Sequence, residues 1–143
     1  MPHLLFELHG SEDGVAQGAE MFEEICSEFG GQDYKWSTKT EERNALWAMR
    51  HNAYYAVLAS KPGARAFVTD ICVPISKLGE AVLDTATDIA KSQIEGPILG
   101  HVGDGNFHAI LLVDPTSSSD IEEAARLTDR KVERALALGG TST

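Results

Sequence analysis

Two histidines flank a glycine-rich turn in the C-terminal half of the chain. His101 and His108 enclose the residues Val-Gly-Asp-Gly-Asn-Phe. Neutral imidazoles are the commonest protein ligands for divalent cations, and a catalytic metal site typically takes about three protein ligands with one position left open. If the turn belongs to a hairpin, both rings can meet at its mouth and supply two of those ligands. The alternative is that both histidines are half-buried, hydrogen-bonded side chains at an ordinary turn, and the residue types leave both interpretations open.

The residues between the histidines suit a tight hairpin. Gly103 and Gly105 can adopt a positive φ without a Cβ clash, and Asp104 and Asn106 can bond nearby backbone amides. Asp104 and Asn106 could also hydrogen-bond the two imidazoles from behind, since metal-bound imidazoles usually donate their other N–H. Holding the turn is the interpretation that we favour for these two side chains.

The hydrophobic spacing predicts helices and strands that alternate around this hairpin. Short apolar runs predict strands at residues 4–10, 33–36, 66–73, 97–99 and 109–113. Three-to-four spacing predicts helices at residues 11–29, from 37–40 to about 60, from Ser76 to about 94, and from 117–119 to Gly139. The last helix is expected to bury a stripe of Ile121, Ala125, Thr128, Val132, Ala135 and Leu136. This alternation, with one direct hairpin, is typical of an α+β fold with an antiparallel or mixed sheet covered by helices on one face.

The composition limits the possible partners. A chain of 143 residues suits one domain, residues 1–143, with a substantial core. Twelve lysines and arginines against twenty-two acids give a net charge of −10, the wrong sign for binding nucleic acid or an anionic lipid surface. The apolar runs are far shorter than the ~20 residues of a transmembrane helix, so we expect no transmembrane segment.

Four segments of the chain together resemble the C-terminal domain of FAD-linked oxidases. They are residues 100–108 (Gly-His-Val-Gly-Asp-Gly-Asn-Phe-His), 46–55 (Leu-Trp-Ala-Met-Arg-His-Asn-Ala-Tyr-Tyr), 69–76 (Thr-Asp-Ile-Cys-Val-Pro-Ile-Ser) and 137–143 (Ala-Leu-Gly-Gly-Thr-Ser-Thr). Their order and spacing cover nearly the whole chain. Within that family, the segments are most similar to those of the cytochrome-linked D-lactate dehydrogenases.

The resemblance implies a ferredoxin-like fold, an FAD cofactor bound mainly by another domain, and a divalent metal, Zn²⁺ or Mn²⁺, held by His101 and His108. It implies oxidation of D-lactate to pyruvate, with the metal activating the substrate hydroxyl and hydride passing to the flavin. Because a guanidinium matches a carboxylate bidentately, Arg50 is the candidate to bind the substrate carboxylate, and a snorkelling arginine is the alternative. Tyr54 would form a wall of the substrate pocket, with packing in the core as its alternative.

In the family, the next residues would be Gly-Glu-His-Gly, which carry a third metal ligand and a histidine close to the substrate. We therefore expect this chain to be part of a larger flavoenzyme and inactive by itself, with the FAD-binding domain upstream and the last active-site segment downstream. The electron acceptor would be a cytochrome or quinone pathway. The expected location is the cytoplasm or the periphery of the inner membrane, and mitochondrial in a eukaryote. A glycolate or D-2-hydroxyglutarate dehydrogenase domain and a non-catalytic ligand-binding or assembly module are the alternatives.

Overall fold

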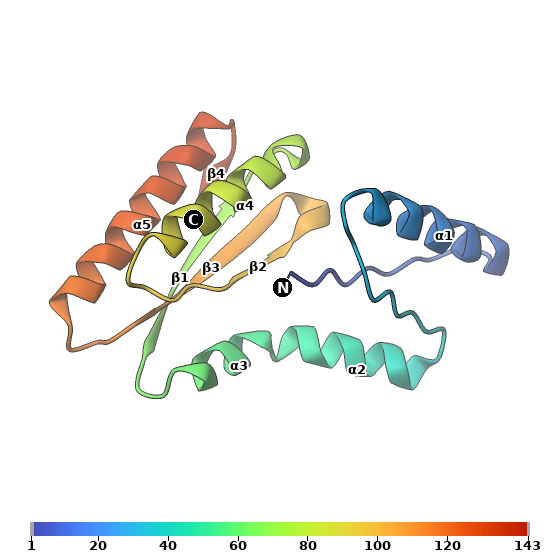
Figure 1. Ribbon diagram of the computed structural model, residues 1–143, viewed down its shortest axis with the longest axis horizontal. Helices are drawn as coiled ribbons and strands as arrows, with labels where there is room; N and C mark the ends of the chain where they lie inside the picture. The colour runs from blue at the N-terminus through green and yellow to red at the C-terminus, as the bar shows by residue number, and fades with distance from the viewer. Residues whose placement is uncertain (1, 143) are drawn as a thin grey trace. The chain divides into compact units, whose positions relative to one another are not determined.

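The computed structural model describes residues 2–142 (Figure 1). The chain divides into two compact units, Met1–His51 and Asn52–Thr143, which we call unit 1 and unit 2. The predicted helices are present in both units, whereas the sheet and the buried core belong to unit 2.

Unit 1 contains helices α1 (Glu12–Glu28) and α2 (Thr40–His51). Ser11 caps α1, since its side chain accepts a hydrogen bond from the Gly14 backbone N–H. The strands predicted at residues 4–10 and 33–36 are not formed, so those predictions are wrong. A strand needs a neighbour that completes its hydrogen bonds. None of the described residues pairs in that way with either segment, and Phe6 instead stacks on Phe22 with ring centroids 4.4 Å apart.

The predicted long second helix is divided at Asn52. Helix α2 ends at His51, and α3 (Ala53–Ser60) follows as a separate helix. Asn52 has φ −86° and ψ 0°, a bridge conformation that interrupts the regular helical backbone. Asparagine favours this because its side chain competes for backbone hydrogen bonds. The prediction of a single helix to residue 60 is therefore wrong at this point.

Unit 2 continues from α3 into a four-stranded sheet with two further helices. In chain order these are β1 (Arg65–Cys72), α4 (Ile75–Ala90), β2 (Ile98–His101), the short 3₁₀ helix η1 (Val102–Asp104), β3 (Asn106–Val113), α5 (Ser118–Ala137) and β4 (Thr141–Ser142). The sheet order is β2-β3-β1-β4, and every neighbouring pair is antiparallel. The prediction of an α+β fold with an antiparallel sheet is confirmed. The order β-α-β-β-α-β is that of split βαβ motifs, and the finer ferredoxin-like assignment stays a prediction.

Helices α4 and α5 lie on one face of the sheet, as Figure 1 shows. Side chains that alternate along β1 and β3, among them Ile71, Phe107 and Leu111, meet buried residues of these helices there. Residues 109–113 of β3 are all buried, so this part of β3 is covered on both faces. Helix α3 also contacts β3.

Three details of unit 2 differ from the sequence predictions. Helix α4 begins after Pro74 and not at Ser76, because the fixed φ of proline suits the residue that leads into a helix. The buried stripe of α5 is Ala124, Leu127, Lys131 and Ala135, one position away from most of the predicted stripe. Strand β4, only two residues long, carries too little pattern to be predicted.

Candidate functional site

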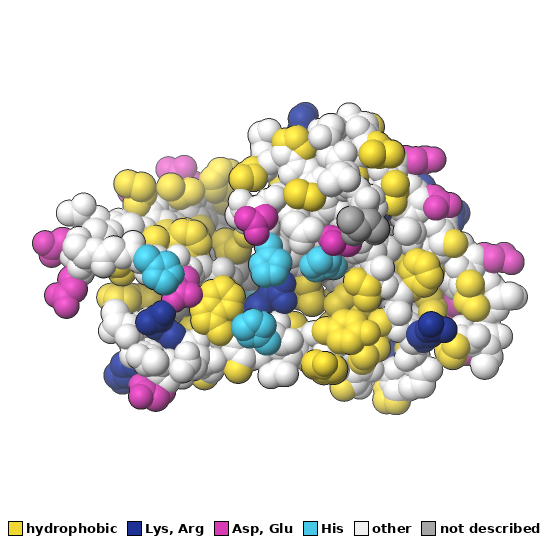
Figure 2. Space-filling model, turned by 180° about the vertical axis from the view of Figure 1, so that it is seen from behind, with side chains coloured by type: hydrophobic (Ala, Val, Ile, Leu, Met, Phe, Trp, Pro, Cys, Tyr) yellow, Lys and Arg dark blue, Asp and Glu magenta, His cyan; other side chains and the backbone are white. Residues whose placement is uncertain are grey.

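The two histidines lie on one face of the β2–β3 hairpin. The register pairs His101 with Asn106 and Leu99 with His108. Directly opposite residues of antiparallel strands project to the same face, and so do residues two apart on one strand. His101 and His108 are therefore diagonal neighbours, with a Cα separation of about 7–8 Å. Figure 2 shows histidine side chains at the molecular surface, and side-chain exposure of His108 is 30%.

Gly105 holds the tip of this hairpin against the end of β1. Its φ is +71°, and an added Cβ would lie 2.0 Å from the carbonyl oxygen of Val73. The Gly105 carbonyl accepts a hydrogen bond of 2.9 Å from the Val73 N–H. Gly103, in contrast, lies in η1 without a positive φ and has open space around it. Only one of the two glycines therefore uses the conformational freedom that we expected for both.

An acidic residue from β1 lies directly opposite His108. The register pairs Asp70 with His108, and the Asp70 Oδ1 atom lies 3.2 Å from Nδ1 of the imidazole. The same Oδ1 atom accepts a 2.6 Å hydrogen bond from the Asn106 side-chain amide, which also donates to the backbone carbonyl of Ile71. Asn106 is therefore linked to His108 indirectly, through the carboxylate of Asp70. Asp70 was not among the residues predicted from the sequence, although the single carboxylate in a mostly apolar strand was a visible signal.

Asp104 is held by its backbone. Its carbonyl accepts a hydrogen bond of 3.3 Å from the Cys72 thiol. Among the residues that the structure describes, no hydrogen bond joins the Asp104 side chain to either histidine. Its proposed role behind an imidazole stays a prediction.

A buried lysine supports the same strands from the opposite face. Lys131 of α5 is 2% exposed, and its Nζ atom donates to the Thr69 carbonyl at 3.1 Å, the Thr69 hydroxyl at 2.8 Å and the Phe107 carbonyl at 3.3 Å. Nζ also lies 4.5 Å from the centroid of the Phe107 ring. Burial lowers the pKa of the Lys131 ammonium to about 8, while the Asp70 carboxylate pulls that pKa upward.

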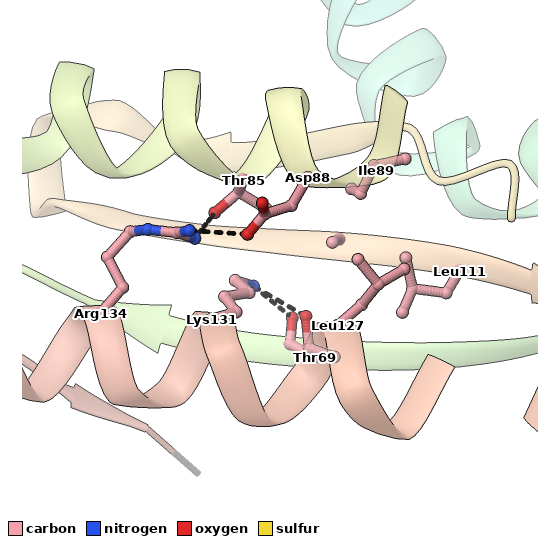
Figure 3. A pocket seen from close by; sticks show the side chains of 9 residues that line it. Thr69, Thr85, Asp88, Ile89, Leu111, Leu127, Lys131 and Arg134 are labelled. Carbon is pink, nitrogen blue, oxygen red and sulfur yellow. Dashed lines mark hydrogen bonds and ion pairs between the residues drawn. The ribbon is translucent and has the colours of Figure 1, made fainter. Parts of the chain in front are cut away.

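Figure 3 shows Lys131 directed toward Thr69 in the space between the sheet and the two helices. On the same side, Arg134 of α5 donates to Asp88 of α4 at 2.7 Å and to the Thr85 hydroxyl at 3.3 Å. Polar groups in this layer are therefore paired with one another. The spacing of Lys131 from Leu127 and Ala135 was the available signal that it lies on the buried stripe.

The two predicted substrate-binding residues come from different units. Arg50 is half-buried in the last turn of α2 in unit 1. Tyr54 is in α3 of unit 2, where its ring meets Tyr55 edge-on with centroids 5.6 Å apart. The proximity of Arg50 to the histidines and the role of Tyr54 as a pocket wall stay predictions.

The donor set of the hairpin fits part of a divalent cation site. Imidazole nitrogens are ligands that Zn²⁺ and Mn²⁺ accept, and the Asp70–His108 pair resembles the carboxylate–histidine arrangement found behind many metal ligands. Within residues 2–142, however, no group of three or more histidine, cysteine, aspartate or glutamate side chains is placed to hold a metal. His101 and His108 would need further ligands from outside this group.

The fold and the hairpin define an α+β domain that presents two histidines and a carboxylate on one face of its sheet. The match to a family model then identifies it: the chain belongs to the FAD-linked oxidase family, and residues 1–143 match the model described as "FAD linked oxidases, C-terminal domain". Membership in this family of oxidoreductases implies an FAD cofactor.

The curated relatives include proteins named as D-lactate dehydrogenases and proteins named as glycolate oxidase subunits. The chain is 42% identical over 142 residues to "Probable D-lactate dehydrogenase, mitochondrial" of Danio rerio, covering 99% of this chain and 29% of that protein. It is 34% identical to "D-lactate dehydrogenase [cytochrome], mitochondrial" of Arabidopsis thaliana, covering 99% and 25%. It is 30% identical to "Glycolate oxidase subunit GlcD" of Bacillus subtilis, covering 98% and 29%. The chain thus spans less than a third of the length of these relatives.

The helices offer no candidate for a membrane span. Within the described part of the chain, none is both long and apolar enough to cross a bilayer.

Proposed function

We propose that this chain is the substrate-side domain of an FAD-dependent 2-hydroxy-acid dehydrogenase that oxidises D-lactate to pyruvate. The names of the relatives from Danio rerio and Arabidopsis thaliana support the substrate. The observation that carries the proposal is the placement of His101 and His108 on one sheet face, with Asp70 against the Nδ1 atom of His108. A purely structural hairpin has no need of this arrangement.

The reaction removes two electrons and two protons from the substrate: the hydroxyl proton, and the α-hydrogen with its electron pair. FAD, when bound, would supply an acceptor for the hydrogen and its electron pair, and a divalent cation such as Zn²⁺ or Mn²⁺ would supply Lewis acidity that lowers the pKa of the hydroxyl group, whose proton passes to solvent. His101 and His108 would hold the cation, together with ligands from elsewhere in the full-length protein.

Two further residues act on the substrate directly in this proposal. The Arg50 guanidinium binds the carboxylate of the 2-hydroxy acid as a planar, bidentate partner. Tyr54 forms an apolar wall that limits the size of the substrate side chain. Asn106 holds the hairpin to β1 and donates to the carboxylate that faces His108, and Asp104 belongs to the turn between the two histidines.

The principal partner in this proposal is the FAD-binding domain of the same enzyme. Large apolar side chains are exposed on unit 1, including Met21 at 61%, Phe29 at 84% and Trp36 at 72%. Exposed hydrophobic side chains are also visible in Figure 2. Where such side chains form a contiguous patch, they mark an interaction site. The relatives named as mitochondrial support a mitochondrial enzyme, with a cytochrome or quinone pathway as the acceptor of its electrons.

The test compares substrates on the full-length enzyme. D-lactate, L-lactate, glycolate and D-2-hydroxyglutarate are assayed with an artificial electron acceptor, and we expect D-lactate to give the highest kcat/KM. The 143-residue chain alone is expected to show no turnover. A preference for glycolate would favour the second candidate, which the Bacillus subtilis relative supports. Activity on none of the four would favour a non-catalytic binding module.

A further inference from the structure

We propose that Asp70 is a positioning residue that holds His108 in the tautomer with hydrogen on Nδ1 and the lone pair on Nε2. The metal-binding consequence of this proposal rests on the proposed function above, whereas the tautomer itself does not. Asp104 and Asn106 were the residues predicted for this role from the sequence, whereas Asp70 belongs to a different strand, β1.

The first argument is the contact itself. Nδ1 of His108 lies 3.2 Å from Oδ1 of Asp70, which is an ion-pair contact and not a hydrogen bond in this structure. A carboxylate only accepts hydrogen bonds, so an imidazole nitrogen beside it is favoured in its protonated form. A neutral imidazole carries one N–H, so the lone pair is then left on Nε2. An imidazole in water prefers the opposite tautomer, and Asp70 would reverse that preference.

The second argument is that the carboxylate is itself oriented. The Asn106 amide donates to Asp70 Oδ1 at 2.6 Å and to the Ile71 carbonyl at 3.0 Å, so it links the side chain of Asp70 to the backbone of the next residue. Asp70 and His108 are also direct cross-strand partners. The pair is therefore fixed both by register and by a neighbouring amide.

The third argument comes from the other face of the sheet. Lys131 donates to the carbonyls of Thr69 and Phe107, the residues that immediately precede Asp70 and His108. One buried ammonium thus ties together β1 and β3 at the point where the pair projects from the opposite face. This contact limits sliding or separation of the two strands at that position.

The consequence concerns the face that His101 shares. With Nδ1 directed at Asp70, the Nε2 atom on the far side of the ring carries the available lone pair. A ligand histidine whose other nitrogen contacts a carboxylate is more basic and better oriented, and loss of such a carboxylate typically reduces metal affinity 10–100-fold. Asp70 would therefore act on a cation without touching it.

The experiment measures the tautomer of His108 by ¹⁵N NMR of the histidine-labelled 143-residue chain, with the signal assigned by its loss in His108→Gln. Nitrogen shifts distinguish the two neutral tautomers from each other and from the charged ring. We expect the Nδ1–H form in the wild-type chain and a shift toward the Nε2–H form in Asp70→Ala. Asp104→Ala is the matched control, because it deletes a carboxylate from the same hairpin region, and it should leave the tautomer unchanged.

The wild-type spectrum alone can overturn the proposal, so the test does not depend on whether Asp70→Ala folds. An Nε2–H form in the wild type, or a change in Asp104→Ala without one in Asp70→Ala, would refute it. Asp70→Asn keeps the shape of the side chain and provides a second variant, in which we expect a smaller shift in the same direction.

Calorimetric titration with Zn²⁺ separates this inference from the proposed function. We expect weak binding by the wild-type chain, a 10–100-fold lower affinity in Asp70→Ala, and no binding in His101→Ala or His108→Ala. An Nδ1–H tautomer that depends on Asp70, with no Zn²⁺ binding by the chain or by the full-length enzyme, would support the positioning role and count against the metal. Zn²⁺ binding with a tautomer independent of Asp70 would support the metal site and refute the positioning role of Asp70.

Discussion

At the scale of single residues, the conformation of the hairpin depends on Gly105, a position where no side chain fits. Gly105 lets the chain pass close to the end of β1 after η1, at the start of the strand that carries His108. The φ of +71° at Gly105 is costly for any residue with a Cβ atom, and the Val73 carbonyl occupies the space that this atom would need.

We therefore expect Gly105→Ala to lower the free energy of unfolding by at least about 2 kcal/mol, because backbone strain and a steric clash add together. Gly103→Ala is the matched control. It lies two residues away, without a positive φ and with open space around it, and should change stability by less than about 0.5 kcal/mol. Urea denaturation of both variants measures the difference. Equal stability of the two would show that the close approach at Gly105 is not required.

At the scale of secondary-structure elements, α5 stabilises the sheet through a buried cation. Lys131 occupies a position of the helix where an apolar residue is normal, and three oxygens of β1 and β3 compensate for part of its burial. The pKa of Lys131, lowered to about 8 by burial, makes this contact sensitive to pH.

The sign of the pH dependence follows from proton binding in the two states. The ordinary lysine pKa of about 10.4 applies to the unfolded chain, so both states hold the proton below pH 8. Between pH 8 and about 10.4 the folded state releases the proton first, and its stability rises with pH.

We expect the free energy of unfolding of the wild type, relative to Lys131→Met, to increase by roughly 1–3 kcal/mol across this window. Urea titrations at several pH values measure it. Lys77→Met, which removes an exposed lysine, should show no such trend. If the difference in free energy of unfolding between the wild type and Lys131→Met does not change with pH, the folded state retains the proton on Lys131.

At the scale of the whole molecule, the two units differ in how they are stabilised. All the buried hydrophobic residues that the structure describes belong to unit 2, and the described residues of unit 1 include none. Apolar burial is the main favourable contribution to folding, and isolated helices as short as those of unit 1 are marginal in water.

Residues 52–143 expressed alone should therefore unfold in one cooperative urea transition, as small single domains do. Residues 1–51 alone should lose their circular dichroism signal gradually, without a cooperative transition. Far-UV circular dichroism during urea titration tests both pieces. A sigmoidal transition in residues 1–51, or none in residues 52–143, would contradict this division.

Local patterns in the sequence determined most of unit 2. Short apolar runs located β1 and β3, glycine and serine signals located the ends of α1 and α5, and the direct β2–β3 hairpin favoured an α+β class with an antiparallel or mixed sheet. The same patterns failed where tertiary partners decide. Residues 4–10 look like a strand but have no strand neighbour within the described chain.

The residues of the candidate site also divide into those that local sequence patterns predict and those that only the tertiary structure places. The sequence by itself determined that His101 and His108 flank a hairpin, because both the glycine-rich turn and its flanking strands are local features. Only the tertiary structure placed Asp70 against His108 and Lys131 behind the same two strands, because those residues lie 38 and 23 positions from His108 and are brought there by strand register and helix packing. Spacing within a segment fixes which face a side chain takes, whereas contacts between distant segments depend on how the sheet is assembled.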